Sequence, residues 1–165
     1  MPYDPFRHHR RSIRLKGYDY SQAGAYFITI CTQNRACLLD VPVVDAMIAH
    51  WWQELANKYP SVSLDAFVVM PNHLHGILLL FDPDPPAPNP QLGTVVQWFK
   101  SMTTNAYIRG VKESGWEPFS GRLWQRNYYE RIIRNERELT ATRLYIEANP
   151  DNWTADENHP GLLRG

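Results

Sequence analysis

Two apolar segments separated by only two residues place the strongest constraint on how this chain folds. Residues 63–70 and 73–81 are rich in aliphatic, β-branched and aromatic side chains, and only Pro71 and Asn72 lie between them. Segments of this composition are typical of β-strands, and a two-residue connection leaves room only for a tight turn. The sequence therefore predicts an antiparallel hairpin.

The second segment of this hairpin begins with His73-Leu74-His75. Because side chains alternate between the two faces of a strand, we expect both imidazoles on one face, about 7 Å apart. Two interpretations are open. The histidines are bonded to backbone or water at the wet end of a buried strand, or they converge on one cation.

The segments around the hairpin alternate between strand and helix patterns. Residues 25–32 are rich in β-branched and aromatic side chains and predict a first strand. Residues 44–59 and 92–111 carry apolar side chains at the i, i+3, i+4 spacing of amphipathic helices. One predicted helix thus precedes the hairpin and one follows it.

The last third of the chain adds one strand and one helix. Residues 123–133 predict a fourth strand or an irregular edge segment, and residues 136–148 predict a helix that Asn135 or its neighbour can cap. The resulting order is βαββαβ followed by a helix. It predicts the α+β class, with a ferredoxin-like antiparallel sheet and an additional C-terminal helix that carries Tyr145.

The 165 residues, 44% of them hydrophobic, are enough for one domain with a substantial core. We expect a basic arm over residues 1–22, the domain over residues 23–155 and a tail over residues 156–165. No apolar stretch approaches the roughly 20 residues of a membrane span, and the first residues lack the apolar segment of a signal peptide. The expectation is a cytoplasmic protein without a membrane partner.

The formal net charge is zero, but the charges are unevenly distributed. Basic residues crowd the start of the chain and recur after its middle, whereas acidic residues gather near the C-terminus. A solvated surface explains either basic cluster, but arginines beside aromatic residues also suit phosphate binding and base stacking. We therefore expect contact with DNA or RNA. The candidate residues are Arg10, Arg11, Arg14, Lys16, Arg122, Arg126, Arg131 and Arg134.

Tyr145 and Asn149 are four residues apart in the last predicted helix and so share one face. A tyrosine at such a position commonly packs, and an asparagine before Pro150 is a common helix stop. Together with His73 and His75, however, the Asn149 amide oxygen would make three neutral ligands. Nitrogen-containing sets of this kind suit Mn²⁺ better than Mg²⁺ alone.

Several separated motifs resemble the bacterial single-tyrosine transposases that carry an HUH motif, the IS200-like transposases. The string MPNHLHG at residues 70–76 and Tyr145 four residues before Asn149 are similar to that family's motif and nucleophile. The similarity covers nearly the whole chain and points above all to the REP-associated tyrosine transposases, a branch linked to short palindromic repeats. Further similar strings are RRSIRLKGYDY (residues 10–20), AYFITICTQNR (residues 25–35) and LWQRNYYERIIR (residues 123–134).

This resemblance implies cleavage of single-stranded DNA next to a hairpin, through a covalent 5′-phosphotyrosine and a free 3′-hydroxyl. It implies that Tyr145 is the nucleophile and that His73, His75 and Asn149 hold Mg²⁺ or Mn²⁺. The implied partner is single-stranded DNA with hairpins from palindromic repeats, bound by a monomer or a homodimer. Two other functions stay compatible with the sequence: a hairpin-DNA or RNA-binding protein without catalysis, and a metal-dependent phosphodiesterase that uses water.

Overall fold

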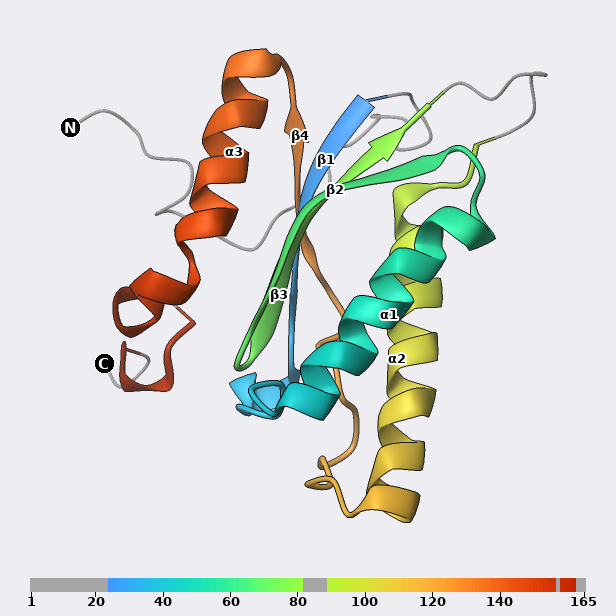
Figure 1. Cartoon of the computed structure of the whole chain (residues 1–165), viewed down its shortest axis with the longest axis vertical. Coiled ribbons are helices and arrows are strands. Elements are labelled where there is room, and N and C mark those ends of the chain that lie inside the picture. Colours follow the sequence, from blue (N-terminus) through green and yellow to red (C-terminus); the bar gives the residue numbers. More distant parts are fainter. Residues whose placement is uncertain (1–23, 82–88, 157, 163–165) are drawn as a thin grey trace.

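The computed structural model describes residues 24–81, 89–156 and 158–162. Its strands are β1 (Gly24–Cys31), β2 (Val62–Met70), β3 (His73–Leu80) and β4 (Tyr129–Ile133). They form one four-stranded antiparallel sheet in the order β2-β3-β1-β4 (Figure 1). This is the order of a ferredoxin-like sheet, so the predicted fold class is confirmed.

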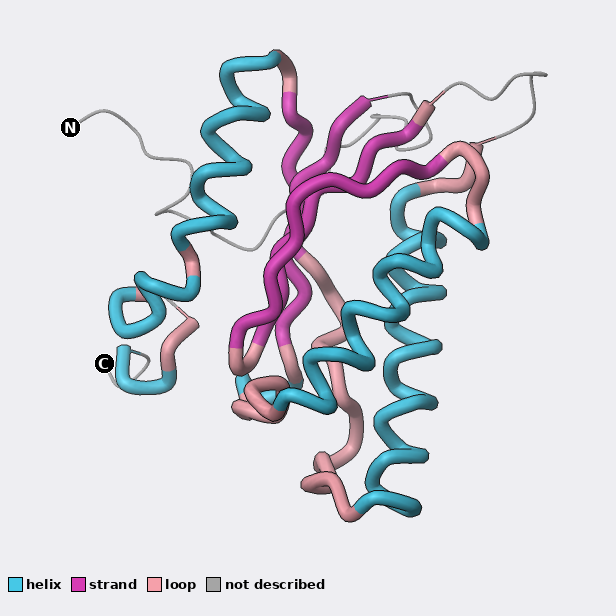
Figure 2. The backbone as a smooth tube through the Cα atoms, viewed as in Figure 1, coloured by secondary structure: helices cyan, strands magenta, loops and turns pink. Residues whose placement is uncertain are grey.

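The α-helices cover both faces of the sheet. The helices α1 (Pro42–Lys58) and α2 (Leu92–Ser114) lie on one face, and α3 (Glu136–Ala148) lies on the other (Figure 1). After α3 the chain continues in short helical turns near the end of that helix (Figure 2). The turns after α3 are η2 (Pro150–Ala155) and η3 (Pro160–Leu162), and a further 3₁₀ turn, η1 (Gln33–Arg35), follows β1.

The larger core lies between the sheet and the pair of helices α1 and α2. Alternate residues of β1, namely Tyr26, Ile28 and Ile30, are buried in it. Trp52 of α1 packs directly on the sheet at Gly76, where an added Cβ would collide with the indole ring. The glycine in the middle of β3 therefore has a packing role, because it allows a helix and a strand to approach closely.

A smaller core lies between the sheet and α3. Phe27, Ile77 and Ile146 are buried there. Arg143 of α3 also forms a bidentate ion pair with Asp65 of β2, with N–O distances of 2.8 and 2.7 Å. The hydrogen bonds from this guanidinium hold the pKa of Asp65 below its ordinary value. Apolar packing and one ion pair thus fix α3 against the sheet.

Residues 123–133, for which the sequence left a strand and an irregular edge segment open, divide into two parts, because residues 123–128 lie outside β4. Trp124 makes only an isolated bridge to Thr32, and its Nε1 donates to Oγ1 of Thr103 at 2.9 Å. Two backbone hydrogen bonds, from Gln33 N–H to the Leu123 carbonyl oxygen and from Gln125 N–H to the Cys31 carbonyl oxygen, hold this segment together with the Trp124 side chain, without a continuous strand ladder. The irregular alternative is right for residues 123–128, and the strand begins at Tyr129.

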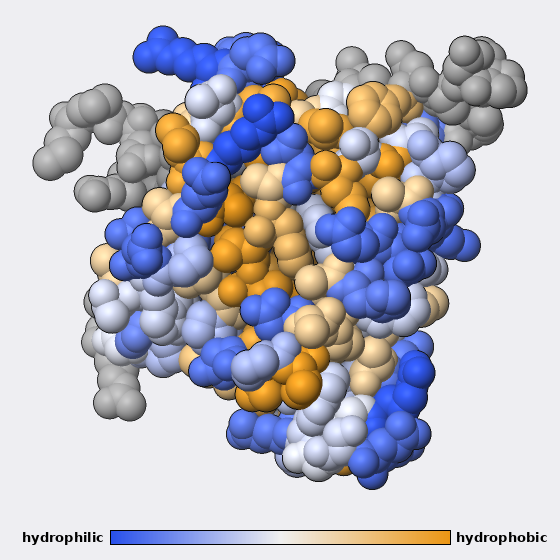
Figure 3. Space-filling model, in the orientation of Figure 1, coloured by the Kyte–Doolittle hydropathy of each residue, from blue (hydrophilic) through white to orange (hydrophobic). Residues whose placement is uncertain are grey.

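The surface of the molecule is apolar along one edge of the sheet. Apolar side chains gather in a strip between α3 and α1 (Figure 3). This strip follows the edge strand β2, whose inner residues are half-buried. No helix in the described parts of the chain is both long and apolar enough to cross a bilayer.

Candidate metal and nucleophile site

His73 and His75 occupy the first and third positions of β3 and lie on the face that α3 covers. Their ring centroids are 4.7 Å apart, and both side chains are fully buried. Nδ1 of His75 lies 2.8 Å from the hydroxyl oxygen of Thr29 on the neighbouring strand. The predicted placement on one face is confirmed, because the alternation of β3 is unbroken here.

Asn72, in the hairpin turn, sets the protonation of His73. Its amide NH₂ donates to the carbonyl oxygens of Arg35 and Asn158 at 3.1 and 2.7 Å, which orients the amide. Oδ1 of Asn72 then lies 2.8 Å from Nδ1 of His73. Because a carbonyl oxygen only accepts, Nδ1 carries the proton, and Nε2 of neutral His73 carries the lone pair that a metal ligand requires.

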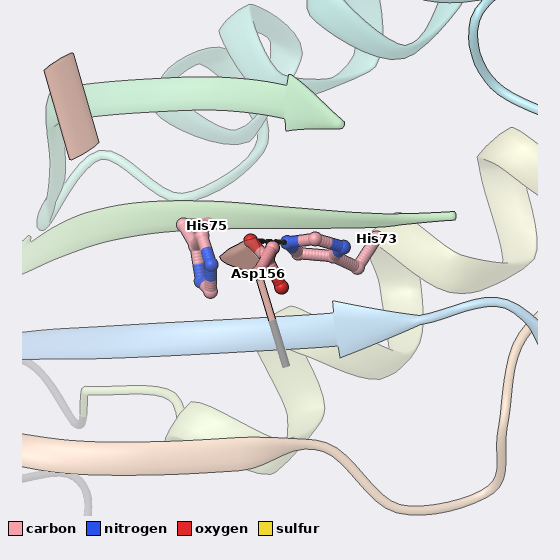
Figure 4. Close-up of side chains that lie close together, drawn as sticks. All are labelled: His73, His75 and Asp156. Atoms are coloured by element: carbon pink, nitrogen blue, oxygen red, sulfur yellow. Dashed lines mark ion pairs between the residues drawn. The ribbon is translucent and has the colours of Figure 1, made fainter. Parts of the chain in front are cut away.

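A carboxylate that the sequence did not single out completes the cluster. Asp156 follows η2, and its Oδ2 lies 3.5 Å from Nε2 of His73 (Figure 4). One ligand atom from each of His73, His75 and Asp156 lies within 4.8 Å of the others. Sequence spacing carries no signal for Asp156, because the 3₁₀ turns after α3 bring it back to the sheet.

The cluster fits a divalent cation. The lone pair on Nε2 of His73 and the Asp156 carboxylate are both acceptors, and at 3.5 Å they repel each other unless a proton or a metal ion lies between them. Two imidazoles and a carboxylate are a ligand set that suits Mn²⁺ and related ions. The arrangement therefore favours the cation over simple histidine packing.

Tyr145 projects from α3 toward the histidine pair. Its ring centroid is 5.5 Å from that of His75 and 6.1 Å from that of Phe27. The side chain is half-buried at the margin of the smaller core. Tyr145 therefore both packs on the smaller core and lies close to the cluster.

Asn149 lies one turn after Tyr145 and is 3% exposed. Its Nδ2 donates to the Tyr145 carbonyl oxygen at 2.9 Å, whereas its buried Oδ1 has no hydrogen-bond partner within the described region. Pro150 disfavours a helical residue before it, yet Asn149 has φ −57° and ψ −46°, because it is the C-cap of α3 and leads directly into η2. A buried amide oxygen of this kind calls for a positively charged or hydrogen-bonding partner.

Comparison with known proteins decides the family. The family model described as "Transposase IS200 like" matches residues 21–149. The chain belongs to the IS200-like transposase family. The resemblance in the motifs is therefore confirmed.

Relatives of this IS200-like transposase occur in Haemophilus influenzae. One is an uncharacterized protein, 36% identical over 173 residues, a match that covers 91% of this chain and 93% of the relative. Another is named provisionally as a REP-associated tyrosine transposase, with 23% identity over 142 residues, 80% of this chain and 73% of the relative.

Two solved structures share the fold of this IS200-like transposase. A REP-associated tyrosine transposase bound to a REP hairpin has a TM-score of 0.63 and 23% identity over 85% of this chain and 73% of its own. A provisionally named transposase from Deinococcus radiodurans has a TM-score of 0.51 and 22% identity over 81% and 95%. At these identities the similarity shows the fold alone.

Four of the predicted DNA-binding arginines of this IS200-like transposase lie within the described residues, in or beside β4. Arg122 and Arg126 are exposed in the segment before β4. Arg131 lies in β4, with its Cζ 5.6 Å from the centroid of the Phe27 ring. Arg134 comes directly after the last residue of β4. The four residues of the basic arm lie outside the described residues. They are Arg10, Arg11, Arg14 and Lys16.

Proposed function

We propose that this IS200-like transposase nicks and rejoins single-stranded DNA next to hairpins through a covalent phosphotyrosine at Tyr145. The observation that carries the proposal is the position of Tyr145, whose ring centroid lies 5.5 Å from that of His75 in the buried cluster. A nucleophile next to a candidate metal site is the arrangement that phosphoryl transfer to a phenol requires.

The residues that would hold the metal ion are His73, His75 and Asp156, with the Asn149 amide oxygen as a further ligand. A bound Mg²⁺ or Mn²⁺ would supply Lewis-acid stabilisation of the charge that develops on the phosphate. Asn72 contributes by keeping the proton on Nδ1 of His73, so that Nε2 faces Asp156 as an acceptor.

Tyr145 has a defined part in the proposed reaction. Its Oη forms a bond to phosphorus while the bond between phosphorus and the 3′-oxygen breaks. The phenol loses its proton, and the departing 3′-oxygen gains one to become a hydroxyl. Because the phosphotyrosine is again a phosphodiester, attack by another 3′-hydroxyl reverses the step without a nucleotide cofactor. A phenol with a pKa of about 10 needs activation for this step at neutral pH.

Hairpin DNA from palindromic repeats is the proposed partner. Support comes from the similar fold of a REP-associated tyrosine transposase bound to a REP hairpin. We assign phosphate contacts to the basic residues of the arm and to the arginines of the domain, since such contacts supply most sequence-independent affinity for nucleic acid. The residues are Arg10, Arg11, Arg14, Lys16, Arg122, Arg126, Arg131 and Arg134.

The test is a search for the covalent intermediate. The protein is incubated with labelled hairpin-containing single-stranded DNA and Mn²⁺ or Mg²⁺, and a denaturant-resistant adduct is sought on a gel. We expect Tyr145→Phe to abolish the adduct. Tyr59→Phe, which alters another half-buried tyrosine that packs near Trp98 away from the cluster, should leave it unchanged.

Other outcomes would identify other functions. An adduct that persists in Tyr145→Phe rules out this nucleophile. Cleavage with no adduct at any time identifies a phosphodiesterase that uses water. Metal-independent binding of the hairpin without cleavage identifies a binding protein that retains the fold.

A further inference from the structure

Three aromatic rings meet on the face of the sheet that α3 covers, and they are here called the aromatic triad: Phe27, His75 and Tyr145. The rings of Phe27 and His75 are stacked, with centroids 5.3 Å apart and an angle of 23° between their planes. Tyr145 lies edge-on to both, with its centroid 5.5 Å from that of His75 and 6.1 Å from that of Phe27. All three distances are in the range of favourable aromatic pairs, roughly 4.5–7 Å. Phe27 therefore contacts both the candidate metal ligand and the candidate nucleophile.

The register of the sheet explains why Phe27 lies beside His75. Thr29 of β1 is paired directly with His75 of β3, and Phe27 comes two residues before Thr29. Because side chains two positions apart point to the same face of a strand, Phe27 and Thr29 are both neighbours of the imidazole. The Thr29 hydroxyl lies 2.8 Å from Nδ1 of His75 and fixes one atom of the ring. Stacking on Phe27 fixes the plane of the ring, which one hydrogen bond leaves free to tilt.

The ring of Phe27 is itself held by its surroundings. It is 2% exposed and belongs to the smaller core. On the side of β4, Cζ of Arg131 lies 5.6 Å from the centroid of the ring, a distance at which a cation is attracted to an aromatic face. Nη2 of Arg131 donates to the Thr142 hydroxyl at 3.1 Å, and Thr142 is in α3, the helix that carries Tyr145. Contacts from β3, β4 and α3 therefore restrict the position of the Phe27 ring.

We propose that Phe27 is a positioning residue that holds the His75 imidazole and the Tyr145 phenol in one fixed relative orientation. A ligand must direct its lone pair at the cation, and a nucleophile must lie at reacting distance from the phosphate beside that cation. One ring in contact with both groups couples these two requirements. This inference rests on the proposed function, since it concerns the geometry of the same site.

The first test uses the metal-free protein and so does not depend on catalysis. In the wild type we expect one narrow set of NMR signals from the ring protons of His75, which are identified by their loss in His75→Gln. Phe27→Leu keeps an apolar side chain but removes the flat ring. In this variant the His75 signals should broaden, because the imidazole exchanges between several tilts. A role of Phe27 in filling the core alone would not broaden them.

The second test follows the metal ion and the nucleophile separately. Isothermal titration calorimetry should show that Phe27→Leu lowers the affinity for Mn²⁺ by about 2–10-fold, the effect expected for the loss of one aromatic pair. The rate of adduct formation is then measured with labelled hairpin-containing single-stranded DNA at saturating Mn²⁺. This rate should still fall by about tenfold or more, because Tyr145 loses its contact with Phe27.

Two further variants separate positioning from packing. Ile133→Val removes a methylene from the same core, outside the aromatic triad. It should lower the melting temperature and leave the His75 signals, the Mn²⁺ affinity and the adduct rate unchanged. Phe27→Tyr retains the ring and should give wild-type values for all three.

The outcomes distinguish this inference from the proposed function. Narrow His75 signals and wild-type Mn²⁺ affinity in Phe27→Leu would overturn the positioning role, even where the wild type forms the adduct. Equal effects of Phe27→Leu and Ile133→Val would also overturn it, since they would reflect the stability of the core. Broadened signals and weaker Mn²⁺ binding in Phe27→Leu, in a protein whose wild type never forms the adduct, would support the contact with His75 and reject the nicking function.

Discussion

At the residue scale, the side-chain amide of Asn72 determines which ring nitrogen of His73 carries the proton. Two backbone carbonyl oxygens, from Arg35 and Asn158, accept from the Asn72 NH₂ and so direct Oδ1 toward His73. An alanine at this position would leave Nδ1 without that acceptor and would allow the other tautomer, whose Nε2 carries the proton. Asn72 is therefore a positioning residue for the candidate metal ligand.

Asn72→Ala is expected to lower the affinity for Mn²⁺ by about 10–100-fold, the usual effect of removing a residue that orients a metal ligand. Isothermal titration calorimetry with Mn²⁺ measures the change in affinity. Asn57→Ala, on the exposed side of α1, is the matched control.

Because Asn72 is buried, Asn72→Ala is also expected to unfold more easily. Thr29→Val provides an independent check, since it removes the hydroxyl at 2.8 Å from Nδ1 of His75 and changes the volume little. Wild-type Mn²⁺ affinity in both folded variants would contradict the assigned role of these hydrogen bonds.

At the scale of elements, α3 is the part that brings Tyr145 to the sheet. Asn135 caps its first turn, since its Oδ1 accepts from the Glu138 N–H at 2.9 Å. Its middle is fixed to β2 by the ion pair of Arg143 and Asp65. A change in this ion pair should therefore affect both the stability of the fold and the placement of Tyr145.

Arg143→Gln is expected to lower the melting temperature at neutral pH by about 1–3 °C, the range for an ion pair at the surface in which Arg143 is exposed and Asp65 is partly buried. The pKa of Asp65 is lowered in the folded protein, so its contribution is complete above the unfolded value of about 3.9. The stabilisation by the ion pair is lost as the pH falls below the unfolded pKa of Asp65 and through its lower pKa in the folded protein.

The melting-temperature difference between wild type and Arg143→Gln should accordingly shrink on acidification. Thermal unfolding followed by circular dichroism at a series of pH values measures it, and Arg137→Gln on the same helix is the control. A difference that stays constant down to strongly acidic pH would show that the ion pair does not stabilise the fold.

At the scale of the whole molecule, distant segments of the chain meet at one end of the sheet. Three segments meet around the cluster of His73, His75 and Asp156: the hairpin turn, the end of α3 and the 3₁₀ turns that follow α3. Trp153 of η2 lies 6.0 Å from His73 between ring centroids, and Asn158 accepts from Asn72. The C-terminal turns are thus part of the site, beyond the residues that the HUH resemblance pointed to.

Asp156→Asn is expected to lower the affinity for Mn²⁺ by at least about tenfold, because it removes the carboxylate closest to Nε2 of His73. The same calorimetric titration measures the change. Asp151→Asn, an exposed carboxylate in η2, should have little effect. An unchanged affinity in Asp156→Asn would remove this residue from the ligand set.

The sequence alone determined the features that depend on local periodicity. Alternation along β3 places His73 and His75 on one face, and helical spacing places Tyr145 and Asn149 on one face of α3. In both cases, the period of the backbone relates residues that are only a few positions apart. The two-residue turn and a cap at Asn135 or its neighbour are also local features, predicted from the length of the connection and from residue type.

Only the tertiary structure decided which of these faces meet and which other residues join them. Asp156 reaches His73 through 3₁₀ turns that have no periodic signature, and Asn72 is oriented by carbonyl oxygens from two distant segments. Residues 123–128 are fixed by contacts with α2 in place of a strand ladder, because the Trp124 indole donates to Thr103 and the Lys100 ammonium donates to the carbonyl oxygens of Gln125 and Arg126. Such contacts depend on how separate segments pack together, and this packing overrides local propensity.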